Sequence, residues 1–173
     1  MEREIPVPRE RGTRLSELYA AHAPRAGRLA YVLTGDPDLA EDVAQEAFSR
    51  LIVRLPALRN TDAIDAYLRR SVVNLCRKHW RRLGRERAFL RAQGPAVTST
   101  TVALPDVAGA DALRRALSRL PYRQRAALVL RFFEDLSERE TARALGCAVG
   151  TVKSLASRGL AALREELEDE DAD

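Results

Sequence analysis

The chain has 173 residues and a net charge of +4, and 46% of its residues are hydrophobic but only 5% are aromatic. A chain of this length forms one or two domains, and the lack of alternating β-branched runs excludes a sheet, so we predict an all-α fold packed from Ala, Leu and Val. No apolar run is long enough to span a bilayer and no charged-then-apolar leader opens the chain, so we expect a cytoplasmic protein without membrane insertion.

The charge is unevenly distributed along the chain. Residues 165–173 hold seven acids and no base, so the remainder carries +11. A basic body favours a polyanionic partner, whereas an acidic end of this kind is typically solvated. Cys76 and Cys147 are too few and too far apart for a disulfide framework, and we expect both to be packing residues.

Two amphipathic helices are predicted in the first third of the chain. Residues 1–14, with two prolines and a glycine among charges, predict a flexible arm, and the first helix then begins near Leu15. Gly35, Asp36 and Pro37 interrupt it. A second helix from about Asp38 to Leu55 has an apolar stripe on one side and an acidic opposite side, formed by Glu41, Asp42, Gln45 and Glu46.

A third helix is predicted from Asp62, and its far end is strongly basic. Residues 69–91 contain nine bases and a single acid. A charge run is usually a solvated face, but Tyr67, Asn74 and Trp80 lie among or beside these bases, and aromatic rings can stack on exposed nucleic-acid bases. This combination favours a nucleic-acid contact.

The following segment changes character, because Pro, Thr, Ser and Gly replace the helical period. It predicts a flexible linker between two small helical domains. The second domain is expected to hold helices over residues 111–120 and 123–134 and then a helix-turn-helix. We expect an arm over residues 1–14 and a first domain over residues 15–92. A linker over residues 93–110 then leads to a second domain over residues 111–165 and an acidic tail over residues 166–173.

The helix-turn-helix is predicted over residues 136–163. Ser137 followed by Glu140 is the capping-box pattern that begins a helix, and Gly146 lies where a tight turn needs a positive φ. Apolar spacing resumes through Val152 and Leu155. The other face carries residue types suited to phosphates and base edges: Thr151, Lys153, Ser154, Ser157 and Arg158. Such motifs also occur in helical proteins without a nucleic-acid role, so spacing alone leaves DNA binding open.

Three stretches carry a family resemblance. The second half is similar to a promoter-reading domain in R-Q-R-A-A-L-V-L-R-F-F-E-D-L-S, which follows Leu120-Pro121, and in G-C-A-V-G-T-V-K-S. The first half is similar to a segment that docks on the polymerase clamp in D-L-A-E-D-V-A-Q-E-A-F. Tyr67-Leu68-Arg69-Arg70 with Val73-Asn74 resembles a segment that opens and reads the upstream strand. Together they resemble the sigma-70 family of bacterial initiation factors, in particular its two-domain extracytoplasmic-function (ECF) group.

The resemblance implies a non-enzymatic factor that needs no metal or cofactor, binds the clamp and flap of core RNA polymerase, directs it to promoter DNA and helps to open the duplex. It leaves open whether an anti-sigma factor restrains the protein. The implied clamp contacts are Glu41, Asp42, Gln45 and Glu46. The implied melted-strand contacts are Arg59, Asn60, Arg69, Arg70, Asn74, Arg77, Lys78, Trp80 and Arg81. The implied upstream-element contacts are Thr151, Lys153, Ser154, Ser157 and Arg158, with Arg123, Arg125 and Arg139 on the DNA backbone.

Some positions depart from the family pattern. Lys78 stands where relatives often have an acid, and Leu155 and Leu160 stand where many carry arginine. Gly159 is also unusual, and a glycine inside a helix costs about 1 kcal/mol of helix propensity. The two leucines predict weaker positive charge on the late part of the second helix of the helix-turn-helix.

Two other functions remain as alternatives. A conventional operator-binding regulator would use the same helix-turn-helix, but it usually needs a dimerising or sensing domain that the first half does not resemble. A metal protein or enzyme would need convergent ligands. Cys76 and His79 share a helix, but only His22 and Cys147 could add nitrogen or sulfur, and both lie in distant segments.

Overall fold

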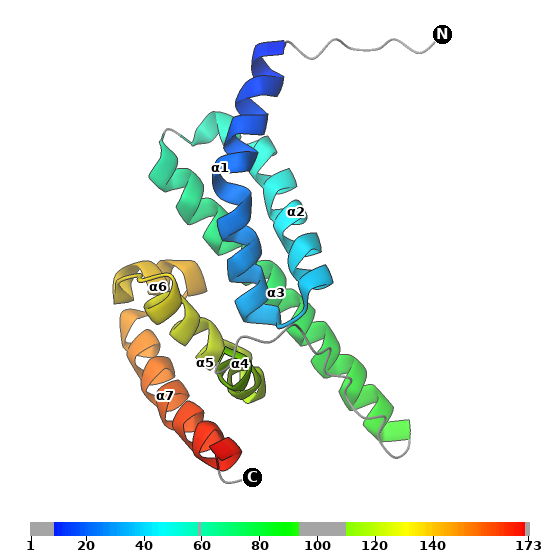
Figure 1. Cartoon of the computed structure of the whole chain (residues 1–173), viewed down its shortest axis with the longest axis vertical. Helices are drawn as coiled ribbons and strands as arrows, with labels where there is room; N and C mark the ends of the chain where they lie inside the picture. The colour runs from blue at the N-terminus through cyan, green and yellow to red at the C-terminus, as the bar shows by residue number, and fades with distance from the viewer. Residues whose placement is uncertain (1–8, 59, 94–109, 172–173) are drawn as a thin grey trace.

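The computed structural model describes residues 9–58, 60–93 and 110–171, with side chains for 15–58, 60–86 and 112–168. Every regular element within these ranges is helical, which confirms the all-α prediction. Figure 1 shows two groups of helices side by side. We call α1 to α3 the first bundle and α4 to α7, with the π-helical turn η2, the second bundle. The predicted linker lies almost entirely outside the described residues.

The first bundle consists of α1 (Arg9–Thr34), α2 (Pro37–Arg54) and α3 (Thr61–Gln93), with a short 3-10 turn, η1 (Leu55–Ala57), after α2. The corner between α1 and α2 follows from local chemistry. Gly35 takes a φ of +72°, and the Asp36 carboxylate accepts a hydrogen bond of 3.0 Å from the Leu39 N–H. An Asx cap followed by proline at the first helical position starts α2 at Pro37. The bundle closes over Leu29, Leu33, Leu51, Val72, Val73 and Cys76, all almost fully buried.

Two helices extend beyond their predicted ends. α1 begins at Arg9, inside the segment predicted to be a flexible arm, because one glycine among good helix formers costs only about 1 kcal/mol and the rest of the helix is anchored. α7 (Val149–Asp171) continues into the predicted acidic tail. There the Glu166 carboxylate lies 2.8 Å from the Arg119 guanidinium, so this part of the tail packs on α4 (Ala110–Arg119).

The predicted helix over residues 123–134 is interrupted. α5 (Tyr122–Leu128) passes into η2 (Val129–Phe133), where the Glu134 N–H donates to the Val129 carbonyl at 3.0 Å, a five-residue step. One extra residue in a turn rotates the positions that follow. Val129, Leu130 and Glu134 are therefore buried, whereas Phe132 and Phe133 are 62% and 49% exposed.

The predicted helix-turn-helix is confirmed. The Ser137 hydroxyl accepts from the Glu140 N–H and the Glu140 carboxylate accepts from the Ser137 N–H, which begins α6 (Glu138–Leu145). Gly146 then takes a φ of +64° and turns the chain toward α7. Val152 on α7 is fully buried against the bundle.

The two bundles contact each other directly, which the sequence did not predict. The Tyr122 hydroxyl donates a hydrogen bond of 2.7 Å to the Val73 carbonyl, and the Arg125 guanidinium donates one of 2.9 Å to the Leu33 carbonyl. Both bonds join α5 to the first bundle. The linker therefore connects domains that share an interface.

Candidate functional site

The acidic face of α2 lies in solvent. Glu41, Asp42, Gln45 and Glu46 are all exposed, because the buried positions of this helix lie on its other side. The Gln45 amide donates to Glu41 at 3.2 Å, and Glu46 pairs with Arg50 at 2.6 Å. The four predicted clamp contacts thus form one continuous exposed row.

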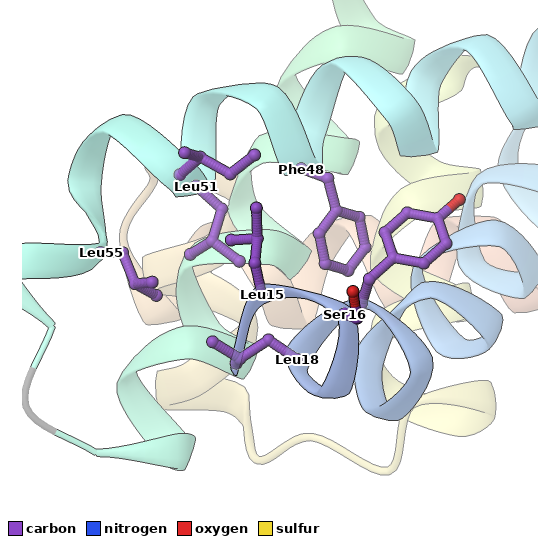
Figure 2. Close-up of a pocket in the computed structure, with 8 residues that line it drawn as sticks. Leu15, Ser16, Leu18, Phe48, Leu51 and Leu55 are labelled. Carbon is purple, nitrogen blue, oxygen red and sulfur yellow. The ribbon is translucent and has the colours of Figure 1, made fainter. Parts of the chain in front are cut away.

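An apolar groove opens between α1 and α2, beyond the acidic face (Figure 2). Figure 2 shows Leu15 and Leu18 of α1 facing Phe48 and Leu51 of α2 and Leu55 of η1. The groove has a volume of about 330 Å³ and is lined by Leu15, Ser16, Leu18, Tyr19, Phe48, Leu51, Ile52 and Leu55. The sequence pattern did not predict this groove. Its signal was Ile52, an apolar residue of α2 that lines the groove and is 47% exposed.

The basic end of α3 brings several predicted melted-strand residues together. Arg70, Lys78 and Arg81 are exposed. Asn74 is half-buried, and its amide oxygen accepts a hydrogen bond of 2.9 Å from Arg77. This bond leaves the amide N–H₂ donors of Asn74 for another partner.

Three predicted melted-strand residues have other partners in the structure. Asn60 has a structural role, because its amide oxygen caps α3 by accepting from the Ala63 N–H at 2.8 Å. Arg59 lies outside the described residues. Arg69 is held at the bundle interface, where its Nε donates to Glu134 at 3.1 Å. Trp80 lies beneath the Arg125 guanidinium, 4.5 Å from the ring centroid, so part of its ring is covered by the second bundle.

The predicted DNA face of α7 is accessible. Lys153, Ser154, Ser157 and Arg158 are exposed and Thr151 is half-buried. The Lys153 ammonium lies 3.6 Å from the Glu138 carboxylate of α6, a loose pair at the protein surface.

Two positions of α7 that differ from the family pattern are occupied by packing residues. Leu155 is only 6% exposed, so the expectation that it lowers charge on the DNA face is wrong, and this position belongs to the core. Gly159 lies against α5, where a Cβ would come within 3.1 Å of the Leu128 side chain. Leu160, in contrast, is 46% exposed.

Basic residues of both bundles line one cleft, which we call the basic cleft. It holds about 480 Å³ between α3, α5 and α7 and is lined by Arg77, Trp80, Arg81, Pro121, Tyr122, Arg123, Gln124, Leu145, Gly146, Leu155 and Arg158. Arg139 is exposed on α6. Arg125, predicted as a DNA-backbone contact, is instead buried, at 2% exposure. Its guanidinium donates to the carbonyls of Leu33, Ser118 and Leu120, and burial lowers the pKa of Arg125 to about 10, so it stays charged at neutral pH.

Among the described residues, neither cysteine shares a cluster with other metal-binding groups. Within the described ranges, no three His, Cys, Asp or Glu side chains come close enough to hold a metal ion. Cys76 is buried, and this burial raises the pKa of its thiol to about 12. His79 has its pKa lowered from the usual value, mainly by burial. No helix in the described part of the chain is long and apolar enough to cross a membrane.

Comparison with known proteins identifies both bundles. Residues 18–86 match the family model of sigma-70 region 2, and residues 110–163 match that of sigma-70 region 4. The chain is 37% identical over 150 residues to the RNA polymerase sigma-E factor of Streptomyces antibioticus, covering 82% of this chain and 77% of that protein. It is 35% identical over 147 residues to the ECF RNA polymerase sigma factor SigM of Mycobacterium tuberculosis, covering 85% and 74%. The chain belongs to the sigma-70 family of RNA polymerase sigma factors, in its ECF group.

A solved structure supports the fold of this sigma factor. The sigma factor RpoE of Bartonella quintana, crystallised with the anti-sigma factor NepR, has a TM-score of 0.70 and 24% identity over 90% of this chain and 97% of that one. Sigma factors are not enzymes, and they direct RNA polymerase to promoter DNA at initiation. The predicted function is thereby confirmed, and the operator-binding regulator and the metal protein are set aside.

Proposed function

We propose which surfaces of this sigma factor carry each step of initiation. The acidic face of α2 binds the polymerase clamp, the basic end of α3 binds the melted strand, and the exposed face of α7 binds the upstream promoter element. The observation that carries this proposal is the separation of charge within region 2, where four predicted clamp residues are exposed on one side of α2 and the bases gather at the far end of α3. Both partners are cytoplasmic, so we place the factor in the cytoplasm.

The clamp contact is supported by the exposure of the acidic row and by Asp42 within it. In the described part of the chain, Asp42 makes no ion pair, so it is free for a basic side chain of another protein. Complementary charge across an interface contributes mainly to association and specificity. Asp42→Lys should weaken binding to core polymerase at least tenfold in fluorescence anisotropy.

A matched control is Glu86→Lys, which reverses an exposed carboxylate on α3, far along the chain from α2. It should leave the affinity for core polymerase within about twofold, since a surface i,i+4 pair contributes about 0.3–0.5 kcal/mol. Equal losses in both variants would show that net charge alone governs binding and would refute the clamp assignment.

A second polymerase contact, to the flap, is assigned to the second bundle. Phe132 and Phe133 stand exposed on η2, and adjacent exposed aromatics mark an interaction surface more often than a solvated one. The double variant Phe132→Ala, Phe133→Ala should reduce transcription from promoters that need the upstream element. It should leave the binding of the first bundle to the polymerase clamp unchanged.

The melted-strand contact is assigned to Asn74 and the bases around it. An amide with free donors can pair with the edge of a base that has left the duplex, and Arg70, Lys78 and Arg81 supply charge for the adjacent phosphates. Asn74→Ala should impair open-complex formation, measured by permanganate footprinting, more than it impairs core binding measured on the same preparation. Equal loss of both would refute the role of Asn74.

Restraint by an anti-sigma factor is a finer proposal. It is supported by two solved structures of similar fold, in which RpoE of Bartonella quintana is in complex with the anti-sigma factor NepR and CnrH is in complex with the cytosolic domain of CnrY. The apolar groove beside the acidic face of α2 gives such a protein an exposed surface to bind. Ile52→Asp in this groove should abolish co-purification of an anti-sigma partner, while the acidic row remains intact.

A further inference from the structure

An ion pair joins the two helices of the helix-turn-helix on their exposed side. The Lys153 ammonium of α7 lies 3.6 Å from the Glu138 carboxylate of α6, and the two side chains are 65% and 38% exposed. A loose pair of this kind at a surface adds little to the stability of a fold. Its position matters more, because Lys153 is one of the predicted contacts to the upstream promoter element.

The fold fixes the backbone of both partners. Glu138 is the first residue of α6 and follows the Ser137 cap, whose reciprocal hydrogen bonds hold this turn. On α7, Lys153 lies between Val152, which is fully buried, and Leu155, which is 6% exposed, so the helix cannot turn about its axis. The two charged side chains are therefore brought together before any DNA is bound.

The neighbouring charged residues are engaged differently. Glu140, the other acid in the first turn of α6, accepts from the Ser137 N–H at 2.8 Å and belongs to the cap. Arg158 is the other cation among the predicted upstream-element contacts. Its Nε donates to the Ser154 carbonyl at 3.2 Å, and in the described part of the chain it pairs with no carboxylate. Of these two cations, Lys153 is the one with a carboxylate beside it.

A carboxylate beside an ammonium changes which groups of DNA the ammonium can contact. Lysine is a point charge on a flexible stem, so near a duplex it binds phosphates as well as base edges. A phosphate is an anion and is repelled by the Glu138 carboxylate, whereas the O6 and N7 acceptors of guanine carry no net charge. Glu138 therefore disfavours a phosphate contact by Lys153 and permits a contact to a base edge.

We propose that Glu138 is a positioning residue for sequence readout, which directs the Lys153 ammonium to the acceptor edge of a base in the upstream element and away from the phosphate backbone. This inference rests on the proposed binding of the upstream element by α7. Lys153 lies near the start of α7, and the first residues of the second helix in a helix-turn-helix contact base edges. Glu138 acts through Lys153 and makes no base contact of its own.

The test uses holoenzyme assembled from core RNA polymerase and the full chain, with a library of promoter duplexes in which the segment upstream of the melted region is randomised. Sequencing of bound and unbound duplexes gives, at each position, the affinity ratio between the best and the worst base, which we call the base-preference ratio. The positions that Lys153 reads are those at which Lys153→Ala lowers this ratio. Glu138→Gln removes the charge and keeps the length of the side chain, and at those positions it should lower the ratio at least threefold.

Glu165→Gln is the matched control. It removes one negative charge from an exposed residue of the same helix, twelve residues after Lys153 and so about 18 Å away along α7. Charges at the surface are largely screened beyond a Debye length of about 8 Å at physiological salt. Glu165→Gln should therefore leave the base-preference ratio unchanged.

A double-mutant cycle shows whether Glu138 acts through Lys153. In a Lys153→Ala background, Glu138→Gln should not change the base-preference ratio, and any effect of Glu138 on the stability of α6 is present in both backgrounds and cancels. Salt dependence provides a second measurement. Without the carboxylate Lys153 gains a phosphate contact, so the slope of log affinity against log salt concentration should become steeper by about 0.9.

The outcomes separate this inference from the function on which it rests. If Lys153→Ala lowers the base-preference ratio but Glu138→Gln leaves either the ratio or the salt slope unchanged, Glu138 does not position Lys153, and the role of α7 still stands. If Glu138→Gln lowers the ratio equally in the Lys153→Ala background, Glu138 contacts a base directly, which also overturns the inference. If Lys153→Ala changes the ratio at no position, the readout assigned to Lys153 is wrong and the inference fails with it.

Discussion

Gly159 offers the sharpest test of how α7 is positioned. Replacing it by alanine would add about 1 kcal/mol of helix propensity. The new Cβ, however, would lie 3.1 Å from Cγ and Cδ1 of Leu128 and 3.4 Å from Cβ of Gln124. Leu128 is 4% exposed and cannot swing into solvent, and overpacking of this kind costs about 1–3 kcal/mol. We therefore expect Gly159→Ala to lower the free energy of unfolding by about 1 kcal/mol.

Gly150→Ala is the matched control on the same helix, because nothing lies within 4 Å of the Cβ it would add. It should raise the free energy of unfolding by up to about 1 kcal/mol. Urea denaturation followed by circular dichroism, with equal m-values required, compares the two midpoints. If Gly159→Ala proves as stable as Gly150→Ala, α7 does not pack on α5 as closely as described, and the glycine would need another explanation.

Three further predictions concern region 4 and the cysteines. Iodoacetamide at pH 8 should modify Cys147 and spare Cys76 in the folded chain, because burial raises the pKa of the Cys76 thiol to about 12; mass spectrometry showing two adducts would contradict this. Ser137→Ala should destabilise region 4 by about 1 kcal/mol through loss of the α6 cap. Hydrogen bonds from Ser137 hold the pKa of Glu140 below its usual value, so the stability they give is present above the unfolded-state pKa and is lost as the pH falls through the folded value. The difference in free energy of unfolding between Ser137→Ala and the parent chain should therefore become smaller in acid. A difference that stays constant down to pH 3 would refute the capping box. Lys153→Ala should cost the holoenzyme about 1–3 kcal/mol at promoters with an intact upstream element, and equal loss on scrambled DNA would show a phosphate contact instead.

The features that sequence predicted well depend on near neighbours. The capping box joins Ser137 to Glu140, and Gly146 supplies the left-handed turn three residues before α7, so both are visible in a short window of sequence. The acidic row of α2 likewise follows from helical spacing, because Glu41 and Gln45 lie one turn apart. Local rules of this kind need no knowledge of the rest of the fold.

The features that sequence missed depend on distant partners. Glu134 meets Arg25 and Arg69 across 109 and 65 residues, and Arg125 meets the Leu33 carbonyl across 92. Nothing in the charge pattern distinguishes these arginines from those in solvent, so Arg69 and Arg125 were both assigned to DNA. Leu155 is different, because helical spacing placed it on the apolar side of α7, as the structure does, and only the family resemblance suggested that it affects charge on the DNA face.

The π-helical turn η2 explains a further difference. A continuous helix over residues 123–134 satisfies the apolar period, and no residue in it requires an extra step. The step is visible only with the tertiary packing, which buries Leu130 and turns Glu134 toward α1 and α3. Sequence therefore predicted the helices that we assign to DNA but not the interface between the two bundles.

The most direct test of the account is run-off transcription with purified core RNA polymerase and a genomic template library. We expect promoter-specific transcripts that require this chain, that disappear with Asp42→Lys and that fall strongly with Asn74→Ala while core binding persists. If core polymerase with this chain yields no specific transcript, while a housekeeping sigma factor on the same core does, the chain does not act as an initiation factor.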